Sequence, residues 1–319
     1  MSKQQLFLKA KNIVASRQRT AEEKAEANRA KIYAEIPELA LMDEKKAEAG
    51  ALAARLAASG NKVAAGQNLQ QMRDISARRK MLLGQRGYSE RDLAPQYTCE
   101  KCGDSGVHNG TICSCVKEEI KKMRRQAIHE AGPLTLCSFD NFDLAYYPDS
   151  MPGIEDSPRA IMAENLRDCR EYAAYFGPRS ENLLLFGNAG LGKTHLALSI
   201  AGEVLDKGYD VIYISAQTAF SQISAQRFNS DTSLFDSMMQ ADLLIVDDLG
   251  TEFVDAYVLS KLYELINGRL VNRPTIYTTN ICDDMLLRTK YTEKIASRLL
   301  GSCSRMPFLG KDVRLQPKL

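Results

Sequence analysis

The stretch from Asn182 to Thr194 constrains the fold of this chain more than any other. Its sequence is N-L-L-L-F-G-N-A-G-L-G-K-T, in which four apolar residues precede a glycine-rich turn. The turn matches the pattern G-x-x-x-x-G-K-[ST], in the required order of strand, loop and helix. Glycines let backbone N–H groups surround phosphate oxygens, and the following helix N-terminus adds partial positive charge. The sequence therefore predicts a phosphate-binding loop between a buried strand and a helix.

The residues of this loop have separate expected roles. Lys193 is expected to reach the β- and γ-phosphates of ATP, and Thr194 to hold Mg²⁺. His195 follows them as a helix residue with no chemistry of its own. The other residues expected around the nucleotide are Gly187, Asn188, Ala189, Gly190, Leu191 and Gly192. A glycine-rich turn that binds no nucleotide is the alternative.

From residue 134 onward, apolar strands alternate with amphipathic helices, which is typical of a parallel α/β sheet. The strand L-L-I-V-D-D ends in Asp247 and Asp248, whose carboxylates would emerge beside the phosphates. Asp247 is expected to act on Mg²⁺ and Asp248 to polarise the attacking water, although two surface aspartates could also end a strand. Strands are expected at 183–186, 210–215, 243–248 and 275–280, and helices at 159–176, 195–207, 258–269 and 294–300.

Three further polar residues are candidates for the same chemistry. Asn280 ends the strand T-I-Y-T-T-N and could orient the lytic water, or it could be a turn-forming residue. Arg298 lies on a helix and is a candidate for the guanidinium that stabilises charge in phosphoryl transfer, often supplied by a neighbouring subunit. A surface ion pair is the alternative for Arg298. Arg314, in G-K-D-V-R, is a second candidate.

The N-terminal third of the chain is rich in strong helix formers and has little strand signal. Helices are expected at 3–35, 38–58 and 62–83. Residues 1–95 contain 18 Lys and Arg against 11 Asp and Glu, an excess of +7. The helices are alanine-rich with narrow apolar faces, so each buries little area alone. They form either a solvated extension or a docking module for a protein partner.

Four cysteines follow in Y-T-C-E-K-C-G-D-S-G-V-H-N-G-T-I-C-S-C. Cys99 and Cys102 have C-x-x-C spacing, and Cys113 and Cys115 form a second pair, so four thiolates can close a tetrahedral structural Zn²⁺ site. A redox pair and free thiols are the alternatives, and the C-x-C half leaves the ligand set partly open. The helix at 116–130 is basic, which fits a linker with a solvated surface or a contact to nucleic acid.

Several motifs together resemble the initiator and helicase-loader branch of the AAA+ ATPases, with the DnaC/DnaI loaders and the IstB transposition ATPases. They are G-N-A-G-L-G-K-T-H-L-A, L-L-I-V-D-D-L-G, T-I-Y-T-T-N and I-A-S-R-L-L-G-S-C, spread over residues 138–314. The cysteine segment and the phrase F-D-N-F-D-L-A-Y-Y are similar to DnaI-like and phage loader proteins of Gram-positive bacteria.

The resemblance implies an α/β AAA+ P-loop core, with a parallel sheet between helices and no full C-terminal lid. A helical N-terminal domain and a small zinc knuckle are expected to precede it. The implied segments are 1–95 (partner docking), 96–116 (zinc knuckle), 117–133 (linker helix) and 134–319 (ATPase).

The resemblance also implies roles for single residues. Lys193 and Thr194 match the Walker A motif and Asp247 and Asp248 the Walker B motif, while Asn280 matches sensor 1. By the same resemblance, Arg298 is the arginine finger. A helical insertion at about 218–228 would contact single-stranded DNA, with Arg227 and Phe228 as contacts, although a phenylalanine there could equally be core.

The expected activity is ATP hydrolysis, weak in the isolated chain and stimulated by oligomerisation or DNA. The chain would form a ring or spiral, hold a hexameric replicative helicase and release it on single-stranded DNA. An IstB-like partner of a transposase on duplex DNA is one alternative, and a binding module that uses ATP only as a latch is another. No apolar run is long enough to span a bilayer, and the N-terminus lacks the apolar segment of a secretory signal, so we expect a cytoplasmic protein without membrane contact.

Overall fold

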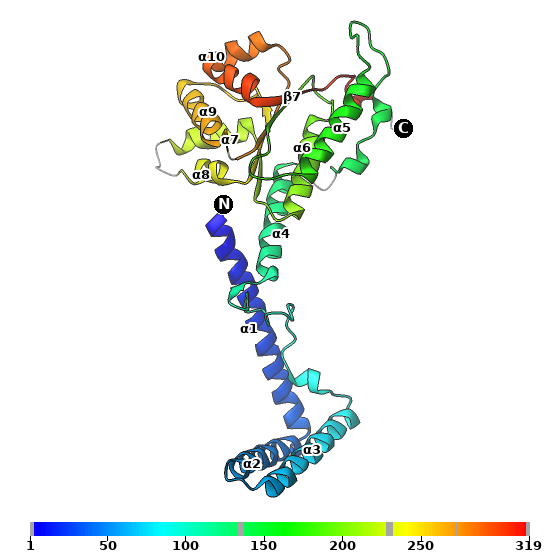
Figure 1. The fold of residues 1–319 in the computed structure, drawn as a ribbon, viewed down its shortest axis with the longest axis vertical. Coiled ribbons are helices and arrows are strands. Elements are labelled where there is room, and N and C mark those ends of the chain that lie inside the picture. Colours follow the sequence, from blue (N-terminus) through cyan, green and yellow to red (C-terminus); the bar gives the residue numbers. More distant parts are fainter. Residues whose placement is uncertain (1–2, 133–136, 228–231, 272, 317–319) are drawn as a thin grey trace. The chain divides into compact units, whose positions relative to one another are not determined.

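The computed structural model describes residues 3–132, 137–227, 232–271 and 273–316 (Figure 1). The chain divides into two compact units. The sheet unit consists of Met1–Ala10 and Lys117–Leu319, and the helical unit of Lys11–Val116. The helices α1 (Lys3–Glu35) and α4 (Ser114–Ala131) contribute residues to both. Among the described helices, none is long and apolar enough to cross a membrane.

A parallel sheet forms the centre of the sheet unit. In the described ranges it has five strands, in the order β4-β5-β6-β3-β7. They are β3 (Asn182–Phe186), β4 (Val211–Ser215), β5 (Leu243–Leu249), β6 (Thr275–Thr279) and β7 (Cys303–Pro307). Strands β3, β4 and β5 are rich in consecutive apolar residues because both faces of the sheet are covered. The predicted parallel α/β fold is confirmed.

Helices cover the two faces of this sheet and produce two apolar cores (Figure 1). On one face lie α5 (Pro158–Ala174) and α6 (Lys193–Asp206). The other face is covered by α7 (Ala216–Gln226), α8 (Ser233–Gln240), α9 (Ala256–Arg269) and α10 (Asp284–Ser302). All strands run in the same direction, so their carboxyl ends meet at one edge, where the loops after β3, β5 and β6 lie close together.

In the sheet unit, strand β7, helix α8 and the first part of α10 were among the elements that the sequence did not predict. Strand β7 was missed because its sequence C-S-R-M-P is short and polar, as an edge strand exposed to solvent permits. Helix α8 is only eight residues long. Helix α10 begins ten residues before the predicted helix, and it is broken at Thr292, whose φ is 71° and ψ 157°.

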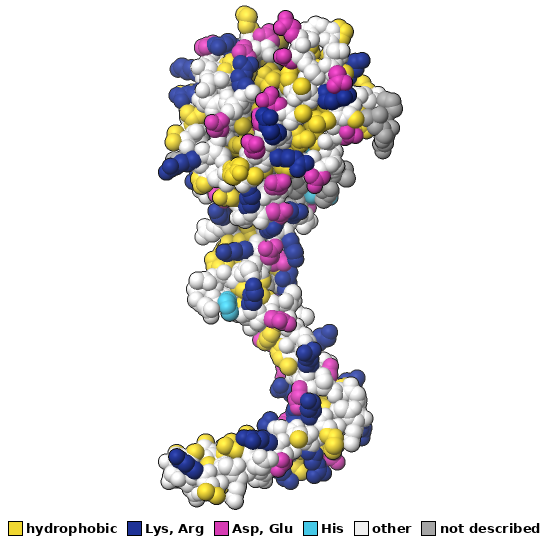
Figure 2. Space-filling model, turned by 45° about the vertical axis from the view of Figure 1, so that its right-hand side comes forward, with side chains coloured by type: hydrophobic (Ala, Val, Ile, Leu, Met, Phe, Trp, Pro, Cys, Tyr) yellow, Lys and Arg dark blue, Asp and Glu magenta, His cyan; other side chains and the backbone are white. Residues whose placement is uncertain are grey.

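The basic helix α4 directs much of its charge into the sheet unit. Arg124 and Asp210 form a buried ion pair, and the Lys121 ammonium and the Arg125 guanidinium lie 2.7 and 2.6 Å from Asp206. Over the face seen in Figure 2, basic and acidic side chains are interspersed. Arg124 is therefore part of the internal packing of the unit, whereas Lys121 and Arg125 pair with Asp206 at its surface. The sequence had left a solvated surface or a nucleic-acid contact open for this helix.

The helical unit contains most of α1 together with α2 (Glu38–Ala58) and α3 (Lys62–Gln85). These helices begin and end close to the predicted residues. Alanines let α2 and α3 approach closely, with Ala49, Ala53 and Ala65 buried. A small apolar cluster lies at one end, and its members are Ile32, Ile36, Leu39, Leu83 and Leu93. Each fully buried side chain of this size contributes about 1.5–3 kcal/mol, so the core of this unit is modest.

Candidate nucleotide site and cysteine cluster

A pocket of about 480 Å³ lies at the carboxyl edge of the sheet. The loop Ala189–His195 lines it together with Asp247, Asp248 and Asn280. Gly190 and Gly192 have φ of 74° and 86°, which L side chains rarely adopt. A Cβ added at Gly190 would lie 1.8 Å from an Asp312 oxygen. The predicted glycines are therefore required both by backbone conformation and by close packing.

Lys193 begins α6 and is 5% exposed. Its ammonium donates to the backbone oxygens of Gly187 and Asn188, at 2.7 Å each, and to Asn280 Oδ1 at 2.8 Å. Burial lowers the pKa of Lys193, while the carboxylate of Asp248 acts in the opposite direction. The structure thus brings Lys193 and Asn280 together, although 87 residues separate them.

The Asp247 carboxylate is buried and accepts hydrogen bonds from three hydroxyls. Thr194 Oγ1 lies 2.9 Å from Oδ1, Thr278 Oγ1 lies 2.6 Å from Oδ1, and the Tyr213 hydroxyl lies 2.7 Å from Oδ2. Sequence reasoning missed Tyr213 and Thr278, whose only signal was their position on strands neighbouring β5. A threonine hydroxyl beside a carboxylate is an oxygen pair of the kind that Mg²⁺ prefers, so these residues fit the expected ion.

Asp248 has an unusual backbone with φ of 52°, and the pairing of β5 with β6 shifts register between Val246 and Leu249. Its N–H donates to Thr278 Oγ1 at 2.8 Å. Burial, and then the charge of Asp247, raise the pKa of Asp248. A carboxyl group with a raised pKa beside the phosphate loop is suited to accept a proton from water.

A wall of aromatic residues closes one side of the pocket. Phe142 and Tyr147 stack with centroids 5.7 Å apart, and the Tyr147 hydroxyl donates to the Leu191 oxygen at 3.0 Å. His195 packs edge-on against Phe142, and its Nε2 lies 2.9 Å from the Ser138 oxygen. The phrase F-D-N-F-D-L-A-Y-Y carried this signal, but sequence reasoning used it for family likeness only. Such a wall offers a flat apolar surface at the nucleotide pocket.

The remaining candidates are dispersed. Arg314 lines the pocket, whereas Arg298 does not and lies exposed on α10, where it interacts with Tyr263. Arg227 lies over the Tyr257 ring, 4.9 Å from its centroid. Phe228 lies outside the described residues.

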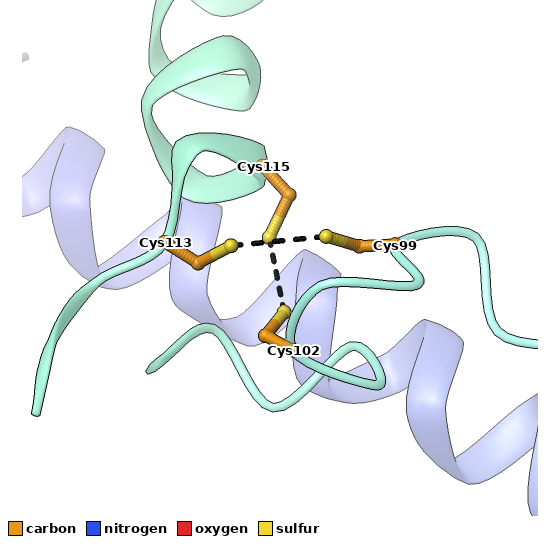
Figure 3. Close-up of side chains that lie close together, drawn as sticks. All are labelled: Cys99, Cys102, Cys113 and Cys115. Atoms are coloured by element: carbon orange, nitrogen blue, oxygen red, sulfur yellow. Dashed lines mark hydrogen bonds between the residues drawn. The ribbon is translucent and has the colours of Figure 1, made fainter. Parts of the chain in front are cut away.

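The four predicted cysteines converge in the helical unit (Figure 3). Their sulfurs all lie within 4.8 Å of one another, with Cys99 to Cys113 at 3.7 Å and Cys102 to Cys115 at 3.5 Å. A tetrahedral Zn²⁺ with bonds of about 2.3 Å requires sulfurs about 3.8 Å apart, so the four sulfurs fit this ion. The Cys115 N–H lowers the pKa of the Cys113 thiol to about 6, whereas burial raises the pKa of the Cys115 thiol.

Asp104 shapes this cluster and was not recognised from the sequence. Its side chain is almost fully buried and accepts N–H bonds from Thr98 at 2.7 Å and Cys99 at 3.0 Å. The Cys113 N–H donates to the Gly106 oxygen, which joins the two halves of the knuckle across the short hairpin of β1 (Val107–His108) and β2 (Thr111–Ile112). Hydrogen bonds from backbone N–H groups therefore orient the two cysteine pairs, and a metal ion would join the four sulfurs.

Comparison with known proteins identifies the nucleotide domain. The family described as IstB-like ATP binding protein matches residues 163–319. The phage-like element PBSX protein XkdC of Bacillus subtilis is 26% identical over 232 residues, which cover 66% of this chain and 81% of XkdC. The replicative helicase loader DnaC of Escherichia coli is 29% identical over 119 residues, which cover 36% of this chain and 49% of DnaC. The nucleotide domain is therefore similar to the IstB-like ATP binding proteins and to DnaC.

Other proteins similar to this chain belong to mobile elements. The ATP-binding protein of insertion sequence IS5376 from Geobacillus stearothermophilus is 30% identical over 154 residues, which cover 45% of this chain and 59% of that protein. The chain thus spans about half the length of DnaC and somewhat more of the insertion-sequence protein. A crystal structure of the DnaC helicase loader aligns with 56% of this chain and 100% of its own, at 20% identity and a TM-score of 0.48.

Replacing Asp248 should separate activity from stability in the sheet unit. Because its pKa is raised, the folded state binds this proton more tightly than the unfolded chain does. The carboxyl group therefore favours the fold at low pH, and this contribution is lost as the pH rises through the folded pKa. Asp248→Asn should raise the melting temperature at neutral pH, with a gain that shrinks on acidification, and should lower ATP turnover by about 10²–10⁴-fold.

Thermal melts over a pH series and phosphate release measure these two effects. Asp168→Asn is the matched control, because Asp168 is an exposed carboxylate of α5 paired with Arg167. This variant should leave turnover unchanged. An Asp248→Asn protein that melts at or below the wild-type temperature at neutral pH would contradict a raised pKa of Asp248 in the folded state.

Zinc content tests the cysteine cluster. Purified protein should contain about one zinc per chain, and Cys102→Ser or Cys115→Ser should remove most of it, because a structural site needs all four ligands. The helical unit should then lose stability while nucleotide binding persists. Elemental analysis measures the metal, with Cys282→Ser as a control that changes an exposed thiol outside the cluster. Full zinc content in both cluster variants would refute the site.

Proposed function

We propose that this chain is an ATP-dependent loader that binds the replicative DNA helicase and deposits it on single-stranded DNA. One structural observation supports this proposal above the others. The residues of the hydrolytic site all lie in the sheet unit, whereas the helical unit, with its cysteine cluster, contributes none of them. A separate module of this kind is available for a protein partner, with ATP as the assembly and release switch.

In this proposal the sheet unit performs the chemistry. Lys193 and the loop N–H groups hold the β- and γ-phosphates, while Thr194 and Asp247 hold Mg²⁺, which neutralises charge on the phosphates. Asp248 accepts the proton of the attacking water, and Asn280 orients that water. The aromatic wall formed by Phe142 and Tyr147 packs against the base.

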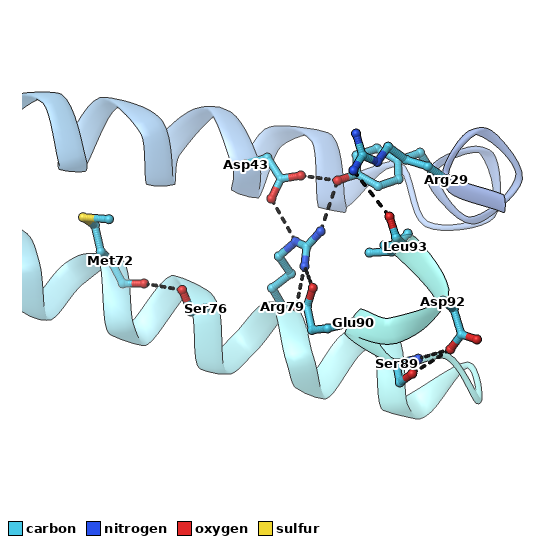
Figure 4. A network of polar contacts seen from close by, with 10 residues as sticks. Arg29, Asp43, Met72, Ser76, Arg79, Ser89, Glu90, Asp92 and Leu93 are labelled. Atoms are coloured by element: carbon cyan, nitrogen blue, oxygen red, sulfur yellow. Dashed lines mark hydrogen bonds and ion pairs between the residues drawn. The ribbon is translucent and has the colours of Figure 1, made fainter. Parts of the chain in front are cut away.

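The helical unit provides a rigid surface for the partner (Figure 4). Arg79 of α3 is nearly buried. Its guanidinium forms an ion pair with Asp43 of α2 at 2.8 Å and donates hydrogen bonds to Glu90 and to the Tyr33 hydroxyl, so it joins three other segments. Large apolar side chains remain exposed along α2 and α3, namely Leu41, Leu52, Val63, Leu69 and Met81. A fixed pair of helices with exposed apolar side chains is suited to a helical partner surface.

Arg298 is proposed to complete the site of a neighbouring copy. It is exposed on α10 and does not line the pocket of its own chain, as a finger supplied in trans requires. The chain would then hydrolyse ATP only in a ring or spiral. Arg227 and Phe228 remain proposed contacts to single-stranded DNA.

A second function is favoured by the insertion-sequence relatives and by the IstB-like family match. In this alternative the chain assists a transposase on duplex DNA. The family match begins at residue 163 and does not include the cysteine cluster. We prefer the loader because the cysteine segment resembles DnaI-like and phage loader proteins.

Loading can be measured directly. The chain should form a stable complex with the purified replicative helicase of the organism that encodes it, and ATP should increase the helicase retained on circular single-stranded DNA. Lys193→Ala should bind the helicase but fail to support its retention on DNA. No complex with the helicase, together with capture of a transposase and stimulation by duplex DNA, would favour the alternative.

Hydrolysis should depend on contacts between subunits. The specific activity should rise with protein concentration, and Arg298→Ala should lower it by about 10³-fold, since a trans guanidinium stabilises the transition state. An equimolar mixture of Arg298→Ala and Lys193→Ala should regain activity, because each chain supplies the group that the other lacks. Arg179→Ala, which removes an exposed arginine of the loop before β3, is the control. An Arg298→Ala protein with full activity would exclude this role.

A further inference from the structure

Glu252 is a buried carboxylate outside the catalytic residues named above. It follows β5 by three residues, is 3% exposed and does not line the nucleotide pocket. Its Oε2 accepts the Gly250 N–H at 2.9 Å, and its other oxygen accepts the Tyr291 hydroxyl of α10. The Glu252 backbone oxygen also accepts from the Lys290 ammonium at 3.3 Å. Burying a carboxylate is costly, so these contacts must persist for the loop to keep this position.

On one side, this carboxylate fixes the turn that carries Asp248. The Asp248 oxygen accepts from Thr251 N at 3.2 Å and from Thr251 Oγ1 at 2.9 Å, which closes a turn directly before Glu252. Asp248 has φ of 52° and Gly250 has φ of 114°. Such a backbone persists only when its surroundings determine it. The Glu252 side chain, bonded to the Gly250 N–H in the middle of this turn, provides that constraint.

On the other side, the same carboxylate holds the residue before the break in α10. Tyr291 is fully buried, and burial together with the Glu252 charge raises its pKa, so its hydroxyl stays a donor. Thr292 follows with φ of 71° and ψ of 157°, a region almost exclusive to glycine. A β-branched residue there is strained, and only tertiary contacts on either side can maintain the break. The half of α10 beyond Thr292 carries Arg298.

We propose that Glu252 and Tyr291 are positioning residues that join the Asp248 turn to the break at Thr292, so that Asp248 and the helix half carrying Arg298 change orientation together. This inference rests on the proposed ATPase function. A chain would thereby present Arg298 to its neighbour in an orientation set by its own Asp248 turn. We call the hydrogen bond between the Tyr291 hydroxyl and the Glu252 carboxylate the link. The hydroxyl can be removed, or the carboxylate neutralised, with little change in side-chain volume.

Tyr291→Phe and Glu252→Gln are the informative variants. Each should lower kcat by about 10²-fold with little change in KM, because the displaced groups act in the reaction step and do not bind the nucleotide. Tyr172→Phe is the matched control, since it removes a hydroxyl that donates to the Glu181 oxygen far from this link. It should leave kcat unchanged. Melting curves identify variants that fail to fold.

Amide hydrogen exchange provides a readout that does not depend on turnover. Without nucleotide, Tyr291→Phe should exchange faster in two separate segments at once, residues 249–252 and 293–302. In the wild type, a non-hydrolysable ATP analogue should alter exchange in 293–302, and Tyr291→Phe should abolish that response while retaining the analogue. Faster exchange in only one segment, or an unchanged response to the analogue, would overturn the proposal.

The double variant Tyr291→Phe/Thr292→Gly adds a further test. Glycine adopts the backbone of residue 292 without strain, so the break no longer depends on the link, and part of the lost kcat should return. Absence of rescue would contradict the role of the link in holding the break. A wild-type chain that binds nucleotide but never hydrolyses it would refute the proposed function. Hydrogen exchange in residues 249–252 and 293–302 would still show whether Tyr291 and Glu252 join the two segments.

Discussion

The hydrogen bonds to the buried Asp247 carboxylate determine much of what surrounds it. A buried carboxylate must have its lone pairs satisfied, and here three hydroxyls do so from α6, β4 and β6. These bonds hold β5 in register with β4 and β6, because Tyr213 and Thr278 reach the same side chain. Thr194 joins the phosphate loop to the same carboxylate. The phosphate loop and the centre of the sheet are thus connected through one buried group.

The two units are stabilised by different interactions. The sheet unit has two extensive apolar cores, one on each side of the sheet. The helical unit has one small cluster of aliphatic side chains, and its remaining order comes from the Arg79 network and the cysteine knuckle. A structural zinc would contribute an apparent binding free energy of about 10–16 kcal/mol in a small domain. That is comparable to what the five buried side chains supply at about 1.5–3 kcal/mol each. A module of this kind can vary its surface with little effect on the ATPase.

The sequence was informative where one local rule determined the structure. The glycine pattern predicted the loop, apolar runs predicted β3 to β6, and the cysteine spacing predicted four converging sulfurs. It was silent where the structure depends on contacts between distant segments, as for Tyr213 on Asp247 or Asp104 beneath the knuckle. Strand β7 and the break at Thr292 contradict local propensity, and tertiary contacts override it. The roles of Arg298, Arg227 and Phe228 stay predictions, because they concern other molecules.

The segment after β7 braces the phosphate loop. The Phe308 N–H bonds the Phe186 oxygen, the Val313 N–H bonds the Gly190 oxygen, and the Asp312 carboxylate packs against Gly190. Glycine-rich loops lose much conformational freedom when they become ordered around a ligand. Here a stretch more than a hundred residues away in sequence already restricts that freedom. The entropic cost of nucleotide capture is thus partly met when the domain folds, and less binding energy is spent on ordering the loop.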